Sequence, residues 1–119
     1  TKDLFSIIYQ KQLLYTIDHP ISINNCNWDL TLNIKKPLIL NIKNINIKFY
    51  NKDDIKITEK EIDNIFKIGF ENLIKISGNI NQDCIIKKIK LSFSILSLRN
   101  DIDIIYGGEN PSTICFRFN

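Results

Sequence analysis

The chain has 119 residues, of which 44% are hydrophobic and 24% are charged, and its formal net charge is +3. This length suits a single globular domain over residues 1–119, and the composition is not that of a disordered chain. No apolar stretch reaches the roughly 18 to 20 residues of a membrane-spanning helix, so no membrane span is expected within this chain.

Isoleucine dominates the apolar residues: there are 26 of them, and there is no alanine, valine or methionine. Lysine and asparagine are also frequent, whereas arginine occurs only twice. This bias is typical of a protein encoded by an AT-rich genome. Because the chain lacks methionine, we expect the domain to be excised or processed from a longer protein.

The three cysteines, Cys26, Cys84 and Cys115, lack the paired spacing of a zinc site and are accompanied by a single histidine. A structural zinc site needs three or four ligands at set spacings, so no metal site is predicted, and no cofactor is expected. An odd number of cysteines allows three reduced thiols, or one disulfide and one thiol. Reduced thiols are the favoured interpretation, and this pattern does not separate a cytosolic from a secreted protein.

The amino-terminal part contains mainly strand signals. Residues 1–15 fit either an amphipathic helix with one lapse or a strand, and a helix is slightly favoured. Two short strands are expected around a turn at His19–Pro20. Residues 28–34 alternate cleanly between polar and apolar side chains, which predicts a strand. Its inward positions are Trp28, Leu30, Leu32 and Ile34.

The next strand signal, residues 37–50, changes phase part-way. Apolar residues occupy even positions up to Ile42 and odd positions from Ile45 onward. A shift of one residue turns the side chains to the opposite face of a strand, so Lys43–Asn44 is predicted to be a bulge or a tight turn. A short strand over residues 54–58 follows.

Residues 58–77 carry the clearest helix signal. Thr58 and Glu61 have the spacing of a capping box, in which each side chain satisfies the other residue's backbone N–H. Apolar residues then recur at three- and four-residue steps, and Gly78 is placed to end the helix. The apolar stripe consists of Ile62, Ile65, Phe66, Gly69, Phe70, Leu73 and Ile74. We therefore expect one main amphipathic helix packed on a sheet.

Strand signals return after the expected helix. Residues 86–98 alternate, and a phase change near Ile95–Leu96 predicts a second bulge. Residues 102–106 and 114–118 are expected to pair as a hairpin across the loop at 107–112.

The order of these elements predicts an α+β domain with a mostly antiparallel sheet of bent, bulged strands and one main helix at about 58–77. Strict alternation of strands and helices is absent, which argues against a parallel α/β fold. A β-sandwich with one inserted helix is the alternative.

No residue pattern predicts catalysis. His19 precedes a proline in a turn and has no nucleophile close to it in the sequence. The acidic pairs Asp53–Asp54 and Asp101/Asp103 border strands, where aspartate usually forms turns. The segment at 107–111, "GGENP", lacks the pattern of a phosphate-binding loop. The chain is therefore not expected to be an enzyme.

Lys87, Lys88 and Lys90 form a basic cluster close to Phe93. Basic and aromatic residues occur together in RNA-binding sheets. Strand parity, however, places Phe93 with the core row, and Lys88 and Lys90 on the opposite face. Because the net charge of +3 is also modest, nucleic-acid binding is disfavoured, and a solvated or edge-protecting face is the main interpretation.

Two regions are candidates for binding a partner. The first is the Gly/Pro-containing loop, because loops held by a rigid scaffold often bind partners. The second is the lysine cluster, which could attract an acidic partner. The candidate residues are Gly107, Gly108, Glu109 and Asn110 in the loop, and Lys88 and Lys90 in the cluster.

These observations favour a non-enzymatic protein–protein interaction or structural domain of a larger protein. The alternative is a small stand-alone inhibitor or immunity-type binding protein; a nucleic-acid-binding or catalytic subunit is less favoured. A protein partner is expected, and the sequence leaves the oligomeric state open.

Overall fold

The computed structural model describes residues 2–7, 12–33, 40–68, 73–97 and 113–119. These residues contain seven strands and no helix, and every pairing between strands is antiparallel. The strands are β1 (Lys2–Ile7), β2 (Gln12–Asn33), β3 (Leu40–Tyr50), β4 (Lys56–Ile62), β5 (Phe66–Ile68), β6 (Leu73–Ser97) and β7 (Thr113–Phe118). In this described part of the chain, no helix has the length and apolarity needed to cross a membrane.

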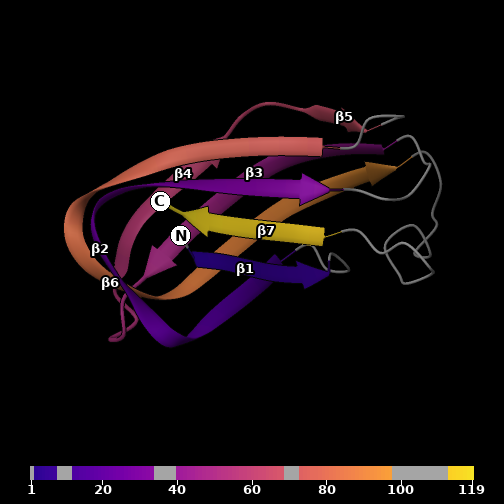
Figure 1. Ribbon diagram of the computed structural model, residues 1–119. Coiled ribbons are helices and arrows are strands. Elements are labelled where there is room, and N and C mark those ends of the chain that lie inside the picture. The colour runs from indigo at the N-terminus through magenta and orange to yellow at the C-terminus, as the bar shows by residue number, and fades with distance from the viewer. Residues whose placement is uncertain (1, 8–11, 34–39, 69–72, 98–112) are drawn as a thin grey trace.

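The strands form one hydrogen-bonded sheet in the order β1-β7-β2-β6-β3-β4, and β5 pairs with β3. The longest strands, β2 and β6, pair with each other and bend together, so that the sheet folds over itself (Figure 1). The first layer contains β1, β7, the C-terminal half of β2 and the N-terminal half of β6. The second layer contains the other halves of β2 and β6, together with β3 and β4.

The pairing pattern is that of a rolled-up hairpin. If β5 is left out and the bent strands β2 and β6 are counted as two segments each, there are eight segments. The first then pairs with the last, the second with the seventh, the third with the sixth and the fourth with the fifth. Rolling this ribbon adds the β2–β7 and β3–β6 pairings and gives two four-stranded layers. An antiparallel sandwich with this nested order is a jelly roll.

Extra residues in the ladders allow the long strands to bend. The β2–β6 register shifts between Thr16 and Ile21 and again between Asn24 and Cys26. Asn25, inside the second shift, has a φ of 47°, a left-handed conformation that asparagine tolerates better than most residues. Bulges of this kind increase strand twist and bending, so they place the corner of the sandwich at these positions.

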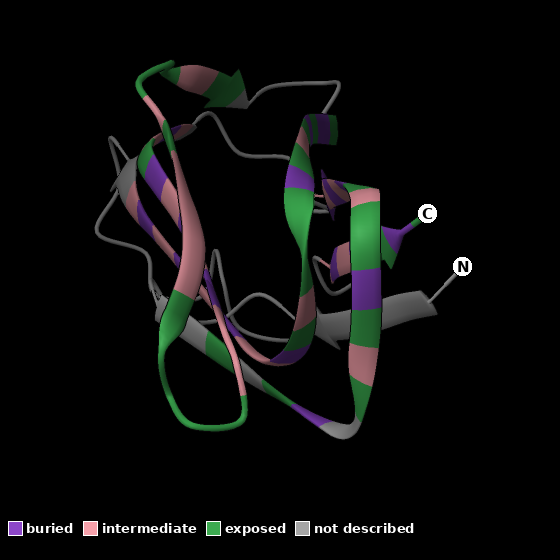
Figure 2. Cartoon of the chain, turned by 90° about the vertical axis from the view of Figure 1, so that its left-hand side faces the viewer, coloured by how far each residue is buried: buried purple, intermediate pink, exposed green. Residues whose placement is uncertain are grey.

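The core lies between the two layers, and buried residues alternate with more exposed ones along much of β2, β3, β6 and β7 (Figure 2). Branched and aromatic side chains fill it, because the sequence offers isoleucine, leucine and phenylalanine instead of smaller residues. Its fully buried members include Leu30, Leu32, Ile45, Ile47, Ile86, Ile89, Leu91 and Ile114.

Four aromatic side chains join the layers. Phe49 of the second layer lies 5.2 Å from Trp28 and within 6.5 Å of Phe116 and Phe118, measured between ring centroids. All three of these partners belong to the first layer, and the rings are tilted or edge-to-face, the favoured geometries for aromatic pairs. The Trp28 indole also lies against Gly78, its direct cross-strand partner on β6.

Two long polar side chains connect the edges of the two layers on the side of β4. Lys60 points inward from β4; its ammonium donates to the carbonyl of Ser77 on β6 and lies 5.9 Å from the Trp28 ring centroid. Gln82 Nε2 of β6 donates to the carbonyl of Ile57 at 3.3 Å. Carbonyl groups on two sheet edges therefore have hydrogen-bond partners. An inward-pointing charge such as that of Lys60 also protects an edge strand from pairing with another chain.

The expected α+β fold with a main helix at 58–77 is wrong. The described part of this segment contains most of β4, all of β5 and the start of β6. Thr58 faces Phe49 across the β3–β4 ladder instead of capping a helix, and Gly78 lies within β6. The expected apolar stripe is also split, since Ile74 is buried while Ile65 is 60% exposed; Gly69 and Phe70 lie outside the described residues. The alternative sandwich with an inserted helix fails at the same segment.

The helix prediction failed because spacing was taken as sufficient evidence. In a chain with 26 isoleucines, three- and four-residue steps between apolar residues arise without a helix. Isoleucine is β-branched and fits a pleated, half-buried surface. Here the pairing of β4 with β3 and of β6 with β2 overrides the local helix signal.

The remaining expectations for strands have mixed outcomes. The inward row of Trp28, Leu30 and Leu32 and the bulge at 43–44 are confirmed, and Asn44 there has a φ of 56°. The favoured helix in 1–15 is wrong, since β1 and the start of β2 lie there. The β3–β6 ladder runs through Ile95 and Leu96 without a shift, so the second bulge is also wrong.

Two expected turns also need correction or lie outside the described residues. His19–Pro20 belongs to one continuous strand, β2, and marks its first register shift instead of a turn between two strands. Residues 113–118 form β7, which pairs with β1 and β2; the expected hairpin partner at 102–106 and the loop lie outside the described part.

Replacement of Gly78 by alanine tests the contact with the indole. An alanine Cβ would lie 2.5 Å from Trp28 Cζ2, so a side chain or strand must shift. We expect Gly78→Ala to lower the free energy of unfolding by about 1–3 kcal/mol, the usual cost of overpacking. Urea titration measures it, with the neighbouring exposed position Ser77→Ala as control. Equal losses in the two variants would contradict the contact.

Truncation of Phe49 tests the junction of the layers. Phe49 is fully buried against three aromatic rings, so Phe49→Ala should cost about 3–5 kcal/mol of stability. Leu14→Ala is the matched control, because the Leu14 side chain is 62% exposed and its removal should cost little. A loss below about 1 kcal/mol for Phe49→Ala would mean that the layers do not depend on this ring.

Candidate interaction surface

The outer side of the second layer carries a polar surface formed by β3, β4 and β6. On β6, Ile89 and Leu91 are buried, and the alternating Lys88 and Lys90 therefore point outward. This confirms the parity argument from the sequence, including the buried position of Phe93. We call the lysine face the outward side chains of Lys43, Lys48, Lys88 and Lys90.

Lys48 and Lys90 are directly opposed on the β3–β6 ladder. Directly opposed side chains on one face of an antiparallel pair have Cβ atoms about 4.5–5.5 Å apart, and like charges there are destabilising. Lys48 has partial compensation, because its ammonium lies 3.9 Å from Glu59 Oε2. Among the described residues, no hydrogen bond or ion pair compensates Lys90. The centre of the lysine face is therefore positively charged.

Lys88 has a carboxylate partner at one end of this face. Its ammonium lies 2.5 Å from Asp54 Oδ1, in the turn between β3 and β4. The Asn51 side chain shapes this turn by accepting hydrogen bonds from the backbone N–H groups of Asp53 and Ile55. The predicted turn role of the Asp53–Asp54 pair is thus supported, and Asp54 adopts a φ of 60°. Because Asp54 is 68% exposed, the ion pair contributes at most about 1 kcal/mol.

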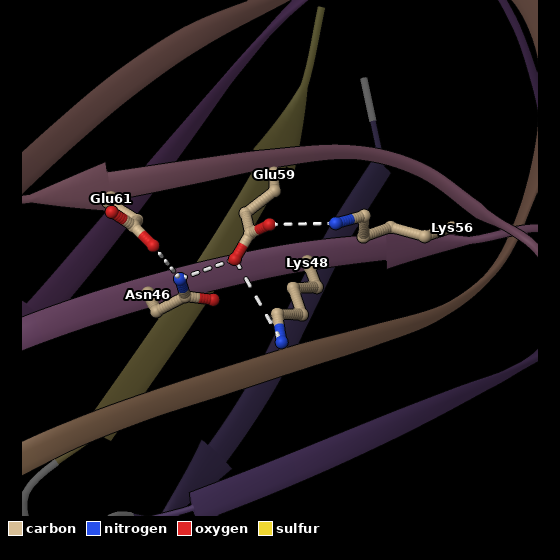
Figure 3. Close-up of polar contacts among 5 residues, drawn as sticks. All are labelled: Asn46, Lys48, Lys56, Glu59 and Glu61. Atoms are coloured by element: carbon tan, nitrogen blue, oxygen red, sulfur yellow. Dashed lines mark hydrogen bonds and ion pairs between the residues drawn. The ribbon is translucent and has the colours of Figure 1, made fainter.

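An acidic network borders the lysine face on β4 (Figure 3). Glu59 is at its centre: Oε1 lies 2.8 Å from the Lys56 ammonium, and Oε2 accepts a 2.7 Å hydrogen bond from Asn46 Nδ2. The same amide donates a longer bond, 3.4 Å, to Glu61 Oε1. The Asn46 Oδ1 atom is buried and has no partner among the described residues. These contacts orient the two glutamates along β4.

The network changes the acidity of its members. The hydrogen bonds from Lys56 and Asn46 to Glu59 lower the pKa of that carboxyl group from its usual 4.5. The same hydrogen bond, together with the charge of Glu59, raises the pKa of Lys56 above 10.5. Both shifts favour the charged forms, so the ion pair persists at neutral pH.

All three cysteines are free thiols, without a disulfide. Cys26 and Cys84 are half-buried near the bend of the β2–β6 ribbon, and burial raises the pKa of both thiols. Each is therefore a weaker nucleophile than an ordinary cysteine at neutral pH. Over the part of the chain that the structure describes, no group of three or more potential metal ligands occurs.

The structure places only one of the two predicted binding regions. Lys88 and Lys90 lie on the lysine face, whereas Gly107, Gly108, Glu109 and Asn110 lie outside the described residues. The His19 side chain also lies outside them. Sequence reasoning missed Lys48 and Glu59, because their proximity to Lys90 depends on the pairing of β3 with β6 and β4. In "NIKFY", Lys48 lies between the apolar residues Ile47 and Phe49, and this alternation was the available signal.

Comparison with known proteins gives a structural likeness only. No family model and no curated protein matches the sequence. A solved structure of the infectious bursal disease virus VP2 subviral particle aligns over 97% of this chain and 29% of that chain, with 14% identity and a TM-score of 0.49. The structure of the Gx strain of the same virus aligns over 97% and 32%, with 13% identity and a TM-score of 0.44.

The chain thus spans about a third or less of the length of the structures it resembles. Identities and scores this low identify no family and assign no role to this chain.

The Glu59 ion pair predicts a pH-dependent contribution to stability. A carboxyl group whose pKa is lowered by folding stabilises the folded state above its unfolded pKa, and this contribution is lost as the pH falls through the folded pKa. We expect Glu59→Gln to be less stable than the wild type at pH 7, with a difference that shrinks below pH 4.5. Urea titrations at several pH values measure it.

Salt provides the control for that experiment. At about 1 M salt the Debye length falls to about 3 Å, so the difference at pH 7 should also decrease. A difference that stays constant from neutral to acidic pH would contradict the assigned role of Glu59.

Proposed function

We propose that this chain is a non-enzymatic protein-interaction domain whose lysine face binds an acidic segment of another protein. The observation that carries the proposal is the direct opposition of Lys48 and Lys90 at the centre of that face. Folding alone does not favour two like charges at a cross-strand pair. A carboxylate placed between the two ammonium groups would replace repulsion by attraction.

The rigidity of the surface supports this proposal. Lys90 lies between the fully buried Ile89 and Leu91, and Lys48 lies between the fully buried Ile47 and Phe49. The core therefore fixes the backbone positions of both lysines, so binding a partner costs little additional backbone entropy. When less conformational entropy is lost on binding, more of the interaction energy appears as affinity.

The charges around the lysine face favour a protein over a nucleic acid. Glu59 and Glu61 border the face on β4, and Asp54 pairs with Lys88 at its end. A phosphate backbone that followed the lysines would meet these carboxylates, whereas a short acidic peptide can contact Lys48 and Lys90 alone. A net charge of +3 is also small for phosphate neutralisation along a strand of nucleic acid.

Binding of defined polyanions tests the proposal. The double variant Lys48→Gln/Lys90→Gln should bind fluorescent poly-L-glutamate about tenfold more weakly than the wild type, because two exposed ion pairs of up to about 1 kcal/mol each are lost. The matched control is Lys52→Gln/Lys67→Gln, which removes the same charge at two exposed positions outside the lysine face. Fluorescence anisotropy gives the affinities, and single-stranded oligothymidylate of equal charge is the competing probe.

Three results are informative. Selective loss in the Lys48/Lys90 variant, with stability unchanged or slightly raised, supports the proposal, because relief of like-charge repulsion favours the fold. An equal loss of affinity in the control variant would mean that binding is non-specific charge attraction, and it would contradict the assigned surface. Tighter binding of the oligonucleotide would assign the face to nucleic acid instead.

A further inference from the structure

A second feature lies on the opposite side of the molecule, on the outer face of the first layer. There the strands β6, β2 and β7 enclose a shallow hollow of about 380 Å³. This volume is at the lower end of the range of about 300–1,000 Å³ that small-molecule sites occupy. Its lining residues are Asp29, Thr31, Lys75, Ile76, Ser77 and Arg117.

The register of the three strands explains the hollow. Asp29 pairs with Ser77 of β6 on one side and with Arg117 of β7 on the other, and Thr31 pairs with Lys75 one row away. The central side chains are short, whereas the two cationic side chains at opposite corners are long. Lys75 and Arg117 lie two strands apart across the sheet and are offset by two residues along the strands. This places their Cα atoms about 12 Å apart. The short polar side chains of Asp29, Thr31 and Ser77 therefore form the base of the hollow, between the long side chains of Lys75 and Arg117.

The charges of the hollow define the chemistry of a ligand. The residues that line the hollow include two cations, Lys75 and Arg117, and one carboxylate, that of Asp29. On its other side, Arg117 pairs with Asp3 of β1. Among the described residues, no hydrogen bond or ion pair engages either the Lys75 ammonium or the Asp29 carboxylate. A guanidinium offers five N–H donors, so Arg117 retains donors for a ligand even when another group is bound to it.

We propose that this hollow binds an acidic monosaccharide, a sugar ring that carries a carboxylate. The sugar carboxylate would accept hydrogen bonds from Lys75 and Arg117. The ring hydroxyls would donate to the Asp29 carboxylate and exchange hydrogen bonds with the Thr31 and Ser77 hydroxyl groups. A hydroxylated ring uses all three central groups, whereas a simple anion would leave the Asp29 carboxylate beside it without a donor. The proposal is independent of the lysine face, which belongs to the other layer.

A titration followed by amide chemical shifts tests this site, with sodium D-glucuronate as the probe. Glucuronate should shift the amides of the lining residues and saturate. Lys75→Gln and Asp29→Asn should each weaken the apparent Kd by about tenfold, which corresponds to the loss of about 1.4 kcal/mol. Both side chains lie on the outer face, so the fold should be retained, and circular dichroism checks it. Lys52→Gln is the control, because it removes one positive charge at an exposed position in the β3–β4 turn, outside both the hollow and the lysine face.

The comparison ligands decide the class of the ligand. Weak or absent shifts with D-glucose and with acetate, together with saturation by glucuronate, support recognition of both the ring and the acid. Equal affinity for acetate or inorganic phosphate would overturn the proposal in favour of a general anion site. Tighter binding of L-glutamate would assign the hollow to an amino dicarboxylate. An absence of shifts at the lining residues, or equal weakening by Lys52→Gln, would also overturn it.

Discussion

Contact between Phe49 and the aromatic side chains of the opposite layer is the interaction on which the whole sandwich depends. The two layers belong to one continuous sheet. Away from the bend, the described residues hold them face to face mainly by packing, with the Lys60 and Gln82 hydrogen bonds along one edge. Phe49 enters the space between Trp28, Phe116 and Phe118, and the indole of Trp28 in turn needs the bare backbone at Gly78. Large rings bury much apolar surface at one point, which offsets the cost of bending two long strands.

The same alternation that buries the core creates two different outer faces. On the second layer, the residues between buried positions include four lysines among asparagine, serine and tyrosine, and β4 adds glutamates at the border. On the first layer, short polar side chains lie between one lysine and one arginine and leave a hollow. The lysine face suits an extended acidic partner, whereas the hollow suits a small molecule. The two proposals therefore rest on different layers of the sandwich and on different kinds of ligand.

Part of the fold was accessible from the sequence, and the reason is period-two alternation. The inward row of Trp28, Leu30 and Leu32 and the outward position of Lys88 and Lys90 follow from parity alone. The phase change at Lys43–Asn44 correctly marked a bulge. The helix at 58–77 was wrong, because isoleucine-rich strands also place apolar residues three and four apart. Only the ladders with β3 and β2 reveal that Thr58 faces Phe49 and that Gly78 lies beneath an indole.

The sequence by itself determined an antiparallel strand-rich domain, the composition of its core and the side of β6 that carries lysine. These properties depend on neighbours along the chain, which a sequence displays directly. Tertiary structure alone decided the rolled hairpin, the opposition of Lys48 to Lys90, and the meeting of Asp29, Lys75 and Arg117 around one hollow. Each of these depends on which strands pair and in which register. Register is restricted by the hydrophobic pattern of each strand, but it becomes definite only when the partner strand and the buried face are known.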